Sequence, residues 1–130
     1  MPHLQLQYSD NLPSRIDFAQ LCRDLNSTLA DTQLFPVGGI RVRAIPVAVY
    51  SIADNHEENS FLDAVLRIGV GRSQEQKNMV GNKLTEKLEA KCTNLLATPH
   101  FALSLEIVEI NPEFSWKTNS IHPRLKNQPK

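Results

Sequence analysis

The sequence predicts an α+β fold, within the broad α/β class, in which a four-stranded sheet carries two helices on one face. Three observations lead to this prediction. Stretches that alternate apolar and polar residues, as half-buried strands do, recur four times along the 130 residues. Two longer stretches carry apolar residues three and four positions apart, as on one side of a helix. Each lies between two of the strands, so we expect two tandem βαβ units, at about residues 1–52 and 59–110.

The size and charge of the chain limit its number of domains and the kinds of partner that it can bind. A chain of 130 residues suits one domain, which we place at residues 1–124 and follow with a polar tail at 125–130. Fourteen Lys and Arg balance fourteen Asp and Glu, so no overall field attracts a nucleic acid or an anionic membrane. Neither a membrane span nor a secretory signal is expected. Cys22 and Cys92 have no C-x-x-C partner, which predicts reduced thiols and a cytoplasmic protein.

The first unit begins with a strand at residues 3–8, where leucine and tyrosine alternate with polar residues. Ser14 is the expected N-cap of a helix at about residues 15–30, whose apolar residues form one stripe. A second strand is expected at residues 40–45. Pro46 interrupts its ladder and indicates a sheet edge or a bulge.

The second unit repeats this order. A strand at residues 61–70 leads into a glycine-containing turn, and Ser73 with Gln76 forms a capping box at the start of a helix. This helix is expected to continue to about Thr98, ahead of a proline. The last strand is expected at residues 101–108.

Two helices can cover only one face of such a sheet. The other face is expected to be partly apolar, and a surface of that kind is rarely left in water. We therefore expect the chain to form an oligomer. Residues 111–130 carry Phe114 and Trp116 and are then expected to end in a polar, loosely held tail. The expected residues of the uncovered face are His3, Gln5, Gln7, Arg41, Arg43, Ile45, Phe61, Val65, Ala102 and Val108.

Pro2 directly follows the initiator methionine, and this position has unusual chemistry. Removal of Met1 would leave Pro2 with a free secondary amine in place of an amide nitrogen. An α-amino group has a pKa of about 7.7 to 8.0, so nearby cations or burial would turn it into a base at neutral pH. The alternative is that Pro2 only starts an edge strand, where proline is tolerated.

The glycine-rich turn before the second helix is a candidate anion site. Gly69 and Gly71 look like the start of a dinucleotide-binding fingerprint, but Gln74 occupies its sixth position and no acidic ribose partner follows. The backbone amides of the helix start, together with Arg72, suit a carboxylate better. The alternative is a plain glycine turn that carries a solvated arginine.

A metal site and an RNA-binding surface are not expected. His56, Glu57 and Glu58 are adjacent in a polar loop but have no partner cluster, so they predict solvated side chains and no metal. RNA-recognition modules share the order of elements, but their aromatic signature is missing. A regulatory domain that binds a small ligand stays open, because the fold alone does not decide function.

Several pieces of the sequence, taken together, resemble the tautomerase superfamily and most closely the 5-carboxymethyl-2-hydroxymuconate Δ-isomerases. The similarity covers nearly the whole chain, and the combination is far more specific than any one piece. The pieces are Met1-Pro2-His3, Tyr8-Ser9-Asp10-Asn11, Gly39-Ile40-Arg41-x-Arg43, Ile68-Gly69-x-Gly71-Arg72-Ser73 and the late aromatic Trp116.

The resemblance implies a homotrimer of tandem βαβ subunits that acts without metal or organic cofactor. It implies that Pro2 is the general base, that Arg41 and Arg72 hold the substrate carboxylates or polarise its 2-oxo group, and that Trp116 closes an apolar wall. Arg43 is a further substrate-binding candidate. The implied substrate is an enol with two or three carboxylates, a 2-hydroxydienoate that becomes a 2-oxo-3-enoate in homoprotocatechuate catabolism. A non-catalytic carboxylate-binding or assembly module on the same trimer is the alternative.

Overall fold

The structure, a computed structural model, describes residues 1–126 and contains one sheet. Its strands are β1 (His3–Ser9), β2 (Arg41–Val47), β3 (Ser60–Ile68) and β4 (Phe101–Glu109). They lie in the order β2-β1-β3-β4. The outer pairs are parallel and the central pair, β1 and β3, is antiparallel. Two βαβ units therefore join through their first strands, and the predicted fold class is confirmed.

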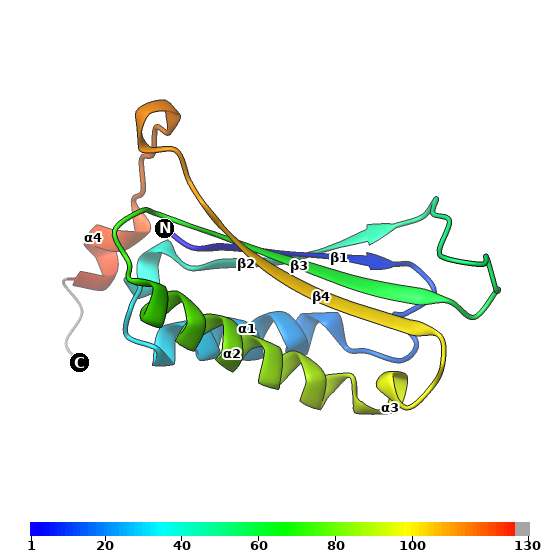
Figure 1. The fold of residues 1–130 in the computed structure, drawn as a ribbon. Coiled ribbons are helices and arrows are strands. Elements are labelled where there is room, and N and C mark those ends of the chain that lie inside the picture. The colour runs from blue at the N-terminus through cyan, green and yellow to red at the C-terminus, as the bar shows by residue number, and fades with distance from the viewer. Residues whose placement is uncertain (127–130) are drawn as a thin grey trace.

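Two long helices cover one face of this sheet, and within residues 1–126 no helix covers the opposite face (Figure 1). The helices are α1 (Phe18–Asp31), α2 (Gln74–Lys91), α3 (Thr93–Leu96) and α4 (Ile121–Lys126), with two short 3-10 turns, η1 (Val37–Gly39) and η2 (Pro112–Phe114). Across residues 1–126, none of the helices combines the length and the apolar character that crossing a bilayer would require.

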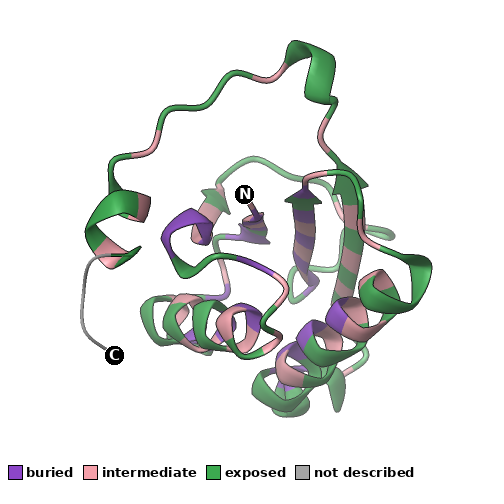
Figure 2. Cartoon of the chain, turned by 90° about the vertical axis from the view of Figure 1, so that its left-hand side faces the viewer, coloured by how far each residue is buried: buried purple, intermediate pink, exposed green. Residues whose placement is uncertain are grey.

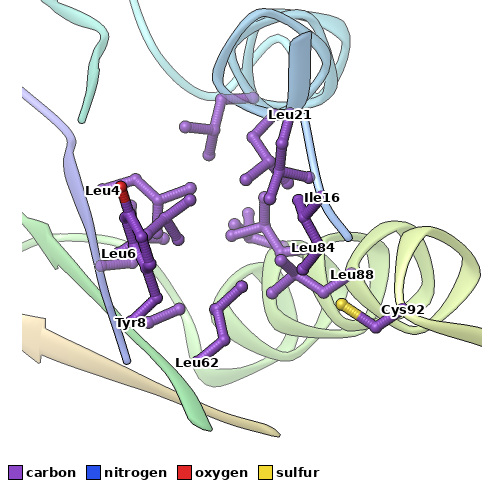
Figure 3. Close-up of a cluster of buried hydrophobic side chains, with 14 of the residues drawn as sticks. Leu4, Leu6, Tyr8, Ile16, Leu21, Leu62, Leu84, Leu88 and Cys92 are labelled. Carbon is purple, nitrogen blue, oxygen red and sulfur yellow. The ribbon is translucent and has the colours of Figure 1, made fainter. Parts of the chain in front are cut away.

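A layer of leucines between the sheet and the two long helices forms the core (Figure 3). In β1 every second side chain points into it, so Leu4 and Leu6 are completely buried while Gln7 is exposed. Full burial of one such side chain stabilises the fold by about 1.5–3 kcal/mol. The helices contribute the buried stripes that their periodicity predicts, as Figure 2 shows. Their buried leucines are Leu21, Leu25 and Leu29 in α1 and Leu84 and Leu88 in α2.

The register of the strands confirms the residues predicted for the uncovered face. His3 lies opposite Arg41 of β2 on one side and opposite Arg67 of β3 on the other. Two residues further along, Gln5 lies opposite Arg43 and Val65. The period of two therefore gathers three arginines around the start of β1.

The predicted start of the first helix was wrong by three residues. The N-cap is Asp17, whose side chain accepts a hydrogen bond from the backbone N–H of Gln20 at 3.0 Å. Residues before it form a turn, in which the N–H of Ile16 bonds to the carbonyl of Leu12. Ser14 stays exposed within this turn. Aspartate and serine are both favoured N-caps, and here aspartate takes the position.

The second helix is not continuous to Thr98, as we had predicted. It begins with the predicted capping box of Ser73 and Gln76 but ends at Lys91, and α3 follows as a separate turn. The hydroxyl of Thr93 donates to the carbonyls of Glu89 and Ala90, at 3.1 and 3.0 Å. Such a side-chain bond competes with the backbone ladder and ends or bends a helix.

The second strand continues through Pro46, which lies opposite Tyr8. Strand β2 is at the sheet edge, so the missing N–H of proline removes no bond to a further strand. The edge assignment is therefore confirmed, although β2 runs to Val47 and is not interrupted.

The segment after β4 contains short helical elements, one of which extends into the polar end that we had expected to be loosely held. It forms η2 and then α4, which packs against η1. A Cβ atom on Gly38 would lie only 2.8 Å from the ring of His122, so glycine is what permits this contact. Leu125 and Lys126, expected in the polar tail, belong to α4. The rest of that predicted tail, residues 127–130, lies outside the described residues.

Candidate active site

A cavity of about 350 Å³ lies where β1 begins. Strands β1, β2 and β3 each contribute a side chain, and the segment after β4 provides the remaining wall. Three lining residues are cations and none is a carboxylate, so the cavity suits an anionic ligand. The lining residues are Met1, His3, Arg41, Arg67, Ile110, Ser115, Trp116, Lys117 and Thr118.

Pro2 lies buried at the start of β1, between Met1 and His3 of this cavity. Its carbonyl accepts a hydrogen bond of 3.1 Å from the backbone N–H of Arg41, which fixes the two strand ends relative to each other. Met1 is attached, so the Pro2 nitrogen is an amide. The Met1 sulfur lies 3.5 Å from a guanidinium nitrogen of Arg41.

The environment of the N-terminus favours a neutral amine. Burial lowers the pKa of the Met1 amino group below its ordinary value of 8.0, and the charges of Lys117, Arg72 and Arg41 lower it further. An amine at this end of β1 would therefore be available as a base nearer to neutral pH than an ordinary α-amino group.

His3 lies between two guanidinium groups. Its Nε2 is 3.3 Å from Nη1 of Arg41, and its Nδ1 is 3.4 Å from Nη1 of Arg43. Burial, followed by the charges of Arg67, Arg41 and Arg43, lowers the pKa of the imidazole. A neutral imidazole has only one nitrogen that can accept. One of the two guanidinium groups must therefore bond elsewhere. Arg43 does not line the cavity and donates to the Gln5 side-chain oxygen at 3.4 Å, whereas Arg41 lines the cavity and is placed to bind an anion there.

Arg72, predicted as an anion-binding residue, does not line this cavity in the single chain. Its guanidinium donates to the carbonyls of Leu34 and Gly69, at 2.9 and 3.2 Å, and stacks on the Phe35 ring at 4.5 Å. Its Nε is buried and has no partner in the described structure. Gly71, directly before Arg72, has a φ of 110°, a backbone conformation that glycine adopts readily. The charge of Arg72 still acts on the N-terminal amine.

Trp116 lines the cavity but is 85% exposed, and nearby Phe114 is 70% exposed. Both belong to the segment that projects beyond the sheet after β4, seen in orange in Figure 1. Large aromatic side chains are seldom left in water to this extent, so this segment is suited to a further contact surface.

The sequence did not reveal Arg67, Lys117 and Asn119 as parts of this region. The Asn119 amide donates to the Gly38 carbonyl at 2.9 Å, and its oxygen accepts from the backbone N–H groups of Ile121 and His122. Asn119 therefore starts α4 and ties the C-terminal segment to η1. An asparagine ahead of a short helix is a usable N-cap signal, whereas Arg67 and Lys117 come together only through the fold.

The sheet order and the position of the cavity define the class of this protein as one with the tautomerase fold. The structure aligns with one described as "W0 fused 4-OT wild type symmetric trimer" at a TM-score of 0.61, covering 87% of this chain and 91% of that one. The two sequences are only 14% identical, so this similarity concerns the fold alone.

More specifically, the chain belongs to the 5-carboxymethyl-2-hydroxymuconate isomerase family, whose model matches residues 2–125. The 5-carboxymethyl-2-hydroxymuconate Delta-isomerase of Escherichia coli is 35% identical over 126 residues, which cover 97% of this chain and all of that protein. A crystal structure of a 5-carboxymethyl-2-hydroxymuconate isomerase from Deinococcus radiodurans R1 aligns at a TM-score of 0.89, with 40% identity and coverage of 95% and 93%. The expected family is confirmed, and the protein is an isomerase.

Proposed function

We propose that this isomerase uses Pro2, freed by removal of Met1, to convert a 2-hydroxydienoate such as 5-carboxymethyl-2-hydroxymuconate into its 2-oxo-3-enoate. The hydroxyl proton leaves the oxygen at C2, and a proton is added at C5. The double bonds C2=C3 and C4=C5 become C2=O and C3=C4, so no atom or electron is gained or lost. One amine that alternates between base and acid is sufficient for this reaction.

The cationic cavity at the start of β1 is the observation that carries this proposal. Negative charge grows on the C2 oxygen as its proton leaves, and a fixed guanidinium stabilises that charge more in the transition state than in the ground state. Arg41 lies at the cavity, and its neighbour Arg43 flanks the same histidine. The remaining cations, Arg67 and Lys117, suit the carboxylates of the substrate.

The amine that the mechanism needs is supported by the environment of the N-terminus. Burial, Lys117, Arg72 and Arg41 lower the pKa of the Met1 amino group. The Pro2 nitrogen is one residue further along the chain, so we infer that burial and these cations would also act on it once Met1 is removed. Arg72 would hold or polarise the substrate from the glycine-rich turn, and Trp116 would close the apolar wall.

We infer that the active form is a homotrimer. Two solved structures with this fold are described as symmetric trimers, and the uncovered sheet face and the exposed aromatic segment after β4 supply surface for such an assembly. Light scattering that finds only a stable monomer would contradict the trimer. Cys22 and Cys92 are free thiols, as is usual in a reducing, cytoplasmic location. Bacterial catabolism of homoprotocatechuate is the pathway that the proposed substrate suggests.

The test compares two preparations that differ only at the N-terminus, each checked by intact-mass measurement. One has Pro2 as its first residue, and the other retains a residue ahead of Pro2. Loss of a general base costs about 10²- to 10⁴-fold in rate, so an ultraviolet assay on 5-carboxymethyl-2-hydroxymuconate should lose that much activity when Pro2 is an amide. In the active preparation kcat/KM should rise with pH through a limb below 8.0, the ordinary value of an α-amino group.

Equal activity in both preparations would refute Pro2 as the base. Binding of the substrate without turnover in either preparation would instead favour the non-catalytic carboxylate-binding module. Pro2→Ala is the companion variant, because it keeps an amine but changes its basicity and position, and we expect it to retain only a small part of the activity.

A further inference from the structure

The end of the sheet away from the cavity holds a cluster of two imidazoles and one carboxylate. His56 and Glu58 come from the loop between β2 and β3, and His100 directly precedes β4. One ligand atom from each lies within 4.8 Å of the other two. The two imidazole rings stack at 4.2 Å, and Nε2 of His100 is 3.5 Å from a carboxylate oxygen of Glu58. The sequence had indicated no partner for His56 and Glu58, because His100 is distant along the chain.

A buried amide orients the ring of His100. Asn59 is only 8% exposed, and its side-chain nitrogen donates to the Ile52 carbonyl at 3.1 Å and to the Asp54 carboxylate at 2.8 Å. The amide oxygen of Asn59 is therefore the atom that faces Nδ1 of His100, at 3.1 Å. An oxygen can only accept, so Nδ1 must carry the proton.

With Nδ1 protonated, Nε2 of His100 is the ring nitrogen that faces the Glu58 carboxylate, 3.5 Å away. A lone pair on Nε2 and the carboxylate would repel each other unless a proton or a metal cation lies between them. Metal-binding histidines are held in this same way, with the remote N–H donated to an oxygen and the other nitrogen free for the metal.

We propose that His56, Glu58 and His100 form a binding site for a divalent transition-metal ion of the zinc type. Imidazole and carboxylate together suit Zn²⁺ or Co²⁺, whereas Ca²⁺ and Mg²⁺ prefer sites made only of oxygen ligands. Water would fill the remaining coordination positions. The ion would link the loop before β3 to the start of β4, so its role is to fix the loop and not to take part in the isomerisation.

Two features of the site limit its affinity. The Nδ1 atom of His56 accepts a hydrogen bond of 3.1 Å from the backbone N–H of Glu58, and metal binding by this ring would give up that bond. The guanidinium of Arg15 lines the same hollow as Glu58 and His100 and opposes a second cation. With only three protein ligands, we expect weaker binding than in a structural zinc site with four.

The test is calorimetric titration of the full-length, chelator-treated protein with Zn²⁺ alone. We expect a saturable site that binds one Zn²⁺ ion per chain. The affinity should fall at least tenfold in Glu58→Gln, which keeps the shape of the side chain. Glu57→Gln removes an equal charge from the neighbouring residue outside the cluster, so it is the matched control and should change the affinity less than twofold. Arg15→Gln should strengthen binding.

A second measurement, the melting temperature with and without Zn²⁺, distinguishes loss of the metal site from misfolding of a variant. Zn²⁺ binds only the folded site, so it should raise the melting temperature of the parent and of Glu57→Gln. The melting temperature of Glu58→Gln or His56→Ala should not respond, although both variants should melt cooperatively. The proposal would be overturned if the parent bound no Zn²⁺ ion at a saturable site. Equal Zn²⁺ affinities in Glu57→Gln and Glu58→Gln would overturn it as well.

Discussion

The two faces of the sheet are built from the same strands but carry opposite properties. Along β1, Leu4 and Leu6 are completely buried against the helices, while His3 and Gln5, which alternate with them, lie on the face without helices. The first set belongs to the core, and the second lies beside the arginines of β2 and β3. One strand can therefore hold the fold together and position the polar groups of the site, because neighbouring residues point to opposite faces.

This separation predicts that stability and chemistry can be changed independently. A leucine of the covered face contacts the core, whereas its neighbour on the open face contacts polar groups near the cavity. The alternation also fixes the register of β1, because a shift of one residue would expose its leucines to water and bury its polar side chains in the core. Substitutions on the two faces test this view.

The largest stability effect is expected at Leu6. Leu6→Ala should lower the free energy of unfolding by about 2 to 5 kcal/mol, because it removes buried contacts and leaves a cavity. Gln5→Ala, its neighbour on the open face, should change that free energy by less than about 1 kcal/mol. Urea denaturation at one fixed protein concentration measures both. Equal losses in the two variants would show that the open face stabilises the folded chain as strongly as the core does.

The features predicted correctly from sequence depend on short-range pattern. The alternation in β1 identified its buried leucines, and Ser73 with Gln76 marked the start of α2 because both residues of the capping box are local. The start of α1 was misplaced because Ser14 and Asp17 are both good caps, and local pattern does not choose between them.

The features that the sequence missed depend on long-range contacts. His100 meets Glu58 only because β3 pairs with β4, and neither residue has a sequence signal for the other. Helix α4 is six residues long, too short for a periodic pattern, and it is defined by Asn119 and its packing on Gly38. Of the candidate site residues, Arg41 and Trp116 line the cavity and Pro2 is a neighbour of two lining residues, whereas Lys117 joins the cavity only through the fold.

A second prediction concerns Arg72, which follows the turn at Gly71 and donates to the backbone carbonyls of Leu34 and Gly69. If Arg72 stabilises the developing anion, Arg72→Ala should lose about 2 to 4 kcal/mol of transition-state stabilisation, measured as a fall in kcat/KM. Lysine should restore this only partly, because it lacks the fork of the guanidinium. The measurement is a steady-state assay of each variant alongside its melting temperature.

The melting temperature separates two roles of this arginine. Its bonds to the carbonyls of Leu34 and Gly69 would be lost in the alanine variant whatever its role in the reaction. If the melting temperature fell while kcat/KM of the folded protein stayed unchanged, Arg72 would stabilise the turn at Gly71 and have no role in the reaction. A loss in kcat/KM with little change in melting temperature would assign it to the substrate.

The smallest expected effect concerns His3 on the open face and its dependence on pH. Burial and the charges of Arg67, Arg41 and Arg43, with the N-terminal amine, hold the pKa of His3 below the ordinary 6.5. Between that lowered value and 6.5 the unfolded chain binds more protons than the folded chain, so stability rises with pH there and falls as the solution is acidified. The contribution of His3 is therefore fully present above pH 6.5 and lost as the pH falls through its folded-state pKa. His3→Gln, which cannot titrate at this position, should show a flatter decline in the free energy of unfolding over this range. Parallel pH profiles for the parent and His3→Gln would show that the arginines of the open face do not act on His3.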